Sequence, residues 1–266
     1  MPRFASCFLP LFLAASCAAS PAMADPTSVD ALAVASLRAV LDKLSATADK
    51  DQAAQIAGAI LASPRLAATC NTLAGDGKLV AIVVYTPGKD AAKPKGPFQA
   101  WTENGTIMIS APLLLELRKS RLYDVVTPDD VLPNNTAFVL GHLACHLQHP
   151  VAPVTAPKFA PGQAHDYTQT IQEYQANRMN AESNAFIEGW NVAVDAATSA
   201  NEGRPLKGNQ VVSLLMNLRY RFGFIGGLQQ TENKLQIKEG GWIVPDEANV
   251  KVFGAVLAKS RVADID

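Results

Sequence analysis

Residues 136–150 read TAFVLGHLACHLQHP, and this stretch carries the strongest functional signal in the chain. An apolar run leads into His142 and His146, four residues apart, and His149 follows three residues later. On a helix, His146 lies about 40° to one side of His142 and His149 about 20° to the other. Imidazoles one turn apart on one helix face can bind the same metal ion. Three of the four histidines fall on this face, so we expect a metal site. The alternative is that they are polar side chains of an amphipathic helix.

Two imidazoles do not complete a zinc site, which needs at least one more protein ligand. The segment EYQANRMNA, Glu173 to Ala181, offers a carboxylate on the next expected helix. In this order, NGTIMISAPLLLEL, AFVLGHLACHL and EYQANRMNA resemble the gluzincin metallopeptidases of the CAAX prenyl endopeptidase family. The motifs of that family are a strand leading into a helix, then His-Glu-x-x-His, then Glu-x-x-Ala-Asp-Arg. The resemblance covers residues 80–185.

The resemblance implies a zincin-like fold with a zinc ion held by His142, His146 and Glu173. It also implies that the strand at Thr106–Ser110 is a sheet edge, to which an extended peptide could add as a further strand. For Glu173 the alternative is an ordinary solvated carboxylate on a helix surface.

Two positions depart from the family pattern. Leu143 stands where the family has its catalytic glutamate, and general acid–base catalysis of that kind is typically worth about 10²–10⁴-fold. Asn177 stands where the family has an aspartate that orients a ligating histidine, and such supporting partners matter about 10–100-fold. Both changes remove a carboxylate and leave the ligands, which favours a retained fold with lost or altered chemistry.

Other side chains could take part only if the fold brings them to the site. His149 lies on the metal face one turn further along, and it could support the site or act as a base. Cys145 lies about 60° from the direction of His142, so it could be a thiolate ligand or form a disulfide with Cys70. Buried free thiols are the alternative for the two cysteines. The remaining candidate bases are His165, Glu182 and Glu188.

The first 24 residues have the layout of a secretory signal peptide, with Arg3, an apolar run from Phe8 to Ala15 and a small-x-small site ending at Ala24. The apolar run is too short to span a bilayer. We therefore expect a periplasmic or secreted protein with no membrane span after cleavage. A lipoprotein linked through Cys17 is disfavoured because Ala14 stands where such signals carry leucine.

Composition and patterning predict an α+β fold that is mainly helical, with a small mixed or antiparallel sheet ahead of the metal-site helices. The formal net charge of −1 and the absence of a basic cluster argue against nucleic acid as a partner. Asn104-Gly105 predicts a two-residue hairpin turn. We expect a signal peptide at 1–24, a helical segment at 25–75, a zincin-like core at 76–200 and a helical extension at 201–266.

Three functions are compatible with these patterns. The first is a zinc-binding pseudopeptidase that lacks the glutamate at position 143 and acts by binding an extended peptide or a protein partner. The second is an active zinc endopeptidase with a substituted base, and the third is a helical structural protein without metal.

Overall fold

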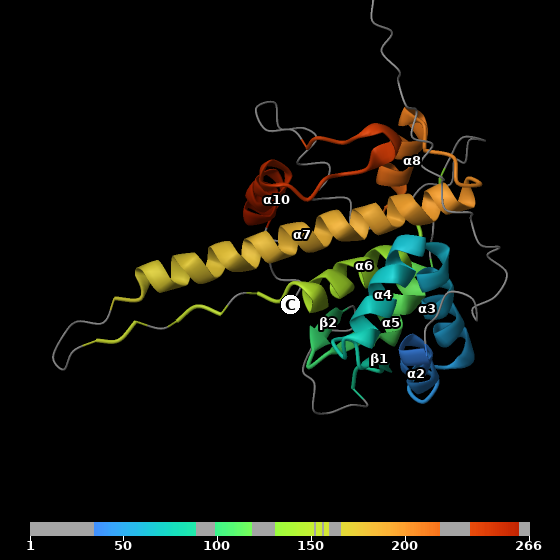
Figure 1. Cartoon of the computed structure of the whole chain (residues 1–266), viewed down its shortest axis with the longest axis horizontal. Coiled ribbons are helices and arrows are strands. Elements are labelled where there is room, and N and C mark those ends of the chain that lie inside the picture. Colours follow the sequence, from blue (N-terminus) through green and yellow to red (C-terminus); the bar gives the residue numbers. More distant parts are fainter. Residues whose placement is uncertain are drawn as a thin grey trace, which may run out of the picture.

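A computed structural model describes residues 35–88, 99–118, 131–151, 153–155, 157–159, 166–218 and 235–260. The expected signal peptide, with Cys17, and the candidate base His165 lie outside the described residues. In the described part, helices pack against a three-stranded sheet, which agrees with the α+β prediction (Figure 1). No helix in these ranges combines the length and the apolar character that crossing a membrane requires.

Among the described residues, three helices precede the sheet: α2 (Ala35–Leu44), α3 (Lys50–Ala62) and α4 (Pro64–Gly75). Asp49 and Gln52 form a capping box at the start of α3, which satisfies backbone N–H groups that lack helical partners. Pro64 begins α4, and the Ser63 hydroxyl caps that helix. Proline is well tolerated in a first turn because its missing N–H has no helical partner there.

The sheet has strand order β1-β3-β2, formed by β1 (Ala81–Tyr85), β2 (Ala100–Glu103) and β3 (Thr106–Ser110). Asn104 and Gly105, with φ of 48° and 75°, form the turn of the predicted hairpin between β2 and β3. Strand β1 pairs with the other side of β3 in parallel, so the sheet is mixed. The expectation that Thr106–Ser110 forms a sheet edge is therefore wrong: β3 is central, and β1 and β2 are the outer strands.

The functional helices follow the sheet. Helix α5 (Ala111–Leu117) leads to α6 (Asn135–Gln148), and the long helix α7 (Thr168–Ala200) crosses α6 (Figure 1). Asn134 caps α6 by accepting a hydrogen bond from the backbone N–H of Ala137. The described part of the chain continues with α8 (Gly208–Asn217), the short 3-10 helix η1 (Glu239–Gly241) and α10 (Glu247–Ser260).

Glycine allows α6 and α7 to approach each other closely. A β-carbon on Gly141 of α6 would lie 2.7 Å from Val192 of α7, and one on Gly189 of α7 would lie 2.8 Å from the backbone oxygen of Phe138. Both distances are shorter than van der Waals contact, so each position excludes any side chain at the present separation of the helices.

Polar contacts anchor α7 to its neighbours. The Trp190 indole donates a hydrogen bond to the carbonyl of Gly241, and the Asn191 amide exchanges two hydrogen bonds with the backbone of Ile243. These contacts fix the segment that leads into α10, and Phe253 of α10 belongs to the same hydrophobic core as α2 to α7.

Replacing Gly189 tests the close crossing. We expect Gly189→Ala to lower the free energy of unfolding by about 1–3 kcal/mol, the usual cost of overpacking a core, because the added methyl group meets backbone that cannot rotate away. Gly58→Ala in α3 is the matched control, since its β-carbon meets no atom within 4 Å, and it should stabilise the protein by up to about 1 kcal/mol. Urea unfolding of both variants measures the difference, and equal effects would contradict the proposed constraint.

Candidate metal centre

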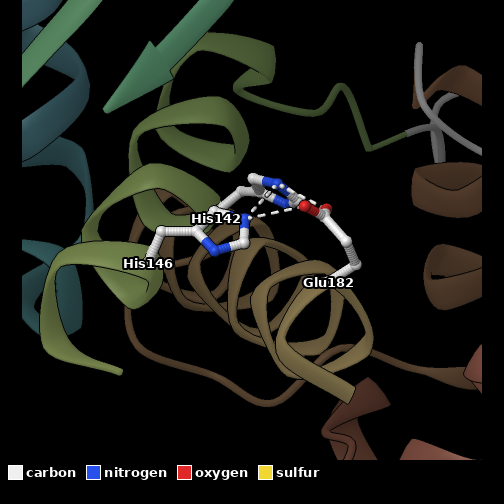
Figure 2. A group of neighbouring side chains, drawn as sticks. All are labelled: His142, His146 and Glu182. Atoms are coloured by element: carbon white, nitrogen blue, oxygen red, sulfur yellow. Dashed lines mark hydrogen bonds and ion pairs between the residues drawn. The ribbon is translucent and has the colours of Figure 1, made fainter. Parts of the chain in front are cut away.

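The structure brings together two histidines of α6 and a glutamate of α7 (Figure 2). The Nε2 atoms of His142 and His146 lie 3.1 Å apart. His142 Nε2 lies 3.5 Å from one carboxylate oxygen of Glu182, and His146 Nε2 lies 3.4 Å from the other. The lone pairs of all three side chains therefore converge on one small volume, and this His-His-Glu group could bind a metal ion.

The spacing of these atoms is compatible with one bound ion. With metal–ligand distances of about 2.0–2.2 Å, neighbouring ligand atoms in a tetrahedral zinc site lie about 3.3–3.6 Å apart. The two Nε2 atoms lie 3.1 Å apart, those of His142 and His146 lie 3.5 and 3.4 Å from different oxygens of Glu182, and one donor atom from each side chain lies within 4.8 Å of the other two. Imidazole donors suit zinc and iron(II), whereas magnesium and calcium prefer oxygen ligands alone.

The three ligand side chains are neither fully buried nor fully solvated. His142 and His146 are 17% and 16% exposed, and Glu182 is 24% exposed. Burial opposes ionisation of Glu182, but hydrogen bonds from the two histidines and their charge outweigh it, so the pKa of the carboxyl lies well below its usual range. The site therefore holds an ionised carboxylate and keeps an accessible side from which a further ligand can approach.

Aromatic packing holds the His142 ring in position. The ring of Phe186 meets it edge to face with centroids 4.8 Å apart, and Phe253 of α10 stacks on Phe186. Phe186 lies one turn after Glu182 on α7, so the same helix supplies the carboxylate and the support for the histidine. This contact restricts the rotation of the ring, which favours one direction for its Nε2 atom.

Glu173, expected from the family resemblance to be the third ligand, does not join the two histidines. It is exposed on α7, nine residues before Glu182. Nine residues are two and a half helical turns, so the two glutamates lie about 180° apart around the helix and about 13 Å apart along it. The carboxylate that the fold delivers to the histidines is Glu182, which the sequence suggested only as a candidate base.

The two expected supporting residues also lie away from the metal group. Asn177 lies about 140° around α7 from Glu182. His149 ends α6 with an exposed side chain, and its backbone N–H donates to the carbonyl of Cys145. Neither belongs to the group of convergent ligand atoms. Phe186 supports His142 by packing, a contact that the motif comparison does not suggest.

A sequence signal for Glu182 exists. Residues 182–185 read ESNA, which repeats the Glu-x-x-Ala spacing of residues 173–176, EYQA. Both copies fall on one helix, so the motif alone does not decide which copy faces the histidines. The choice depends on where α7 crosses α6, and Gly141 and Gly189 set that crossing.

Among the residues that the structure describes, the other candidate ligands and bases either bond to other side chains or lack suitable chemistry. Leu143 is only 4% exposed and packs in the hydrophobic core. Glu188 forms two hydrogen bonds of 2.7 Å with the guanidinium of Arg65. Cys70 and Cys145 are buried free thiols, not a disulfide, and burial raises the pKa of each to about 12. Cys145 is therefore a neutral thiol in the metal-free protein, and it does not belong to the group of convergent donors.

Comparisons with known proteins yield no relative. No protein-family model, no curated protein and no solved structure matches the chain.

Metal content of point variants tests the ligand set. We expect about one metal ion per chain in the wild type, and a loss of most of it in His142→Ala, His146→Ala and Glu182→Gln, because each variant leaves only two donors. Glu173→Gln is the matched control and should keep the metal. Elemental analysis of the purified variants also identifies the ion. Metal retained in Glu182→Gln and lost in Glu173→Gln would instead support the ligand set implied by the resemblance.

Proposed function

We propose that this protein is an exported zinc-binding protein of the gluzincin metallopeptidase type that lacks the catalytic base and acts by binding a peptide or protein partner. The observation that carries the proposal is the combination of three convergent donors, His142, His146 and Glu182, with a buried leucine directly after the first histidine.

Zinc is the ion best suited to this donor set within the proposed family. Two histidines and a glutamate are the protein ligands of catalytic zinc sites such as that of thermolysin. His142 and His146 come from one helix at a spacing of four, and Glu182 comes from the following helix, in the order the resemblance implies. A zinc ion held there would act as a Lewis acid.

What the site lacks for catalysis is a side chain that can transfer a proton. In the family that the motifs resemble, a glutamate at position 143 takes a proton from water and passes it to the leaving amine. Leucine has no group that can exchange a proton. Of the alternatives within the described residues, Glu188 is held by Arg65, and Cys145 is a buried neutral thiol. A site that keeps its donors and lacks its base is suited to binding rather than turnover.

Export and a peptide partner are parts of the same proposal. The support for export is the signal-peptide pattern of residues 1–24, and the support for a peptide partner is the resemblance to peptidases. If the proposal is wrong, experiments should show one of two alternatives: an active endopeptidase with a substituted base, or a structural protein without metal.

Hydrolysis assays separate binding from catalysis. We expect zinc-loaded protein to cleave an unfolded protein substrate no faster than the His142→Ala, His146→Ala double variant, because loss of a general base removes about 10²–10⁴-fold of rate. Gel and mass-spectrometric detection of fragments provides the measurement. Cleavage by the wild type that a chelator and the double variant both abolish would overturn the pseudopeptidase proposal in favour of an active enzyme.

A further inference from the structure

Three aromatic rings from three helices lie in a row that ends at the candidate metal centre. The His142 ring of α6 meets the Phe186 ring of α7 edge to face, at an interplanar angle of 77°. The Phe253 ring of α10 stacks on Phe186 with centroids 6.3 Å apart and an interplanar angle of 14°. Phe186 is 6% exposed, and Phe253 is fully buried. We name these three rings the aromatic row, and they link α10 to a candidate metal ligand.

Helix α10 also packs against the turns of α7 that flank Glu182. A β-carbon on Gly254 would lie 3.2 Å from the Cγ atom of Met179 and 3.5 Å from the Oγ atom of Ser183. Met179 precedes Glu182 by three residues, and Ser183 directly follows it. Helix α7 thus lies between α6 and α10 (Figure 1). Because Gly254 allows a close approach, α10 supports both the helix that carries Glu182 and the ring against which His142 packs.

The direction of the His142 ring decides whether its Nε2 atom can bind an ion. In the observed conformation, this atom lies 3.1 Å from that of His146 and 3.5 Å from Glu182. A histidine side chain has about three χ1 wells and about two χ2 orientations, so a ring without support could adopt up to about six conformations. Binding weakens in proportion to the fraction of molecules in the competent conformation. Support from the aromatic row can therefore strengthen metal binding by up to about sixfold.

We propose that Phe186 and Phe253 are positioning residues for the metal centre, and that the docking of α10 on α7 is thereby coupled to metal binding. This inference rests on the metal-binding part of the proposed function, and it holds whether or not the site catalyses a reaction. Coupling between two binding equilibria is reciprocal. A bound ion should therefore stabilise the docking of α10 by the same factor by which docked α10 strengthens the binding of the ion.

Zinc affinity of ring-deletion variants tests the positioning role. We expect Phe186→Leu and Phe253→Leu to bind zinc about threefold to sixfold more weakly than the wild type, measured by competition with a chromophoric chelator. Leucine keeps the core apolar at each position while the ring is lost. Val252→Ala is the matched control, because Val252 is buried on the same helix but lies about 100° around it from Phe253. This control should bind zinc like the wild type.

Hydrogen exchange tests the reciprocal effect. In the wild type, zinc should slow amide exchange in α10 by about threefold to sixfold, because a peripheral helix exchanges through local opening. Helix α2 packs on β1, α3 and α4, and its exchange serves as the reference for effects of zinc that are not specific to α10. The specific slowing of α10 should disappear in Phe253→Leu.

The outcomes distinguish this inference from the proposed function. A wild type that binds no metal overturns both. Zinc bound equally well by the wild type and the two leucine variants overturns the positioning role alone, and so does an equal weakening in Val252→Ala. Circular dichroism checks the folding of each variant. The exchange measurement on the wild type needs no variant, and zinc that leaves the exchange of α10 unchanged relative to α2 also overturns the inference.

Discussion

The close crossing of α6 and α7 fixes the distances on which the candidate metal centre depends. Gly141 immediately precedes His142, and a side chain there would collide with Val192. Gly189 follows Glu182 by two turns and faces the backbone of Phe138. Protein interiors are close-packed, so separation of the helices by the width of a methyl group would be transmitted to the site. The separations of 3.4 and 3.5 Å between the imidazoles and the carboxylate would then lengthen beyond the reach of one ion.

Polar anchors hold the later part of α7 in the orientation that this crossing requires. Asp195 accepts hydrogen bonds from the Ser63 hydroxyl and the backbone N–H of Arg65, at the start of α4. Glu188 binds the guanidinium of Arg65 through both carboxylate oxygens, a geometry that fixes direction as well as distance. All of these contacts lie after Glu182. The candidate metal centre therefore lies at the boundary between the packed part of α7 and its more exposed first turns.

Local sequence signals predicted the features that local geometry determines. The spacing of His142 and His146 fixes their shared helix face, and Asn104-Gly105 fixes the hairpin turn. Features that depend on distant contacts were not predicted. The central position of β3 results from parallel pairing with β1, a strand more than twenty residues earlier. The choice of Glu182 over Glu173 depends on where two helices cross, because both glutamates begin the same Glu-x-x-Ala spacing on one long helix.

The same geometry could hold either a proton or a metal ion. Two Nε2 atoms 3.1 Å apart can share a hydrogen bond only if one carries a proton, and Glu182 stays ionised beside them. A metal ion bound there would replace that proton without moving the side chains far, so little conformational entropy would be lost when the ion enters. Preorganisation of this kind would lower the cost of binding an ion, and it depends on the close crossing of α6 and α7 as well as on the spacing of the two histidines.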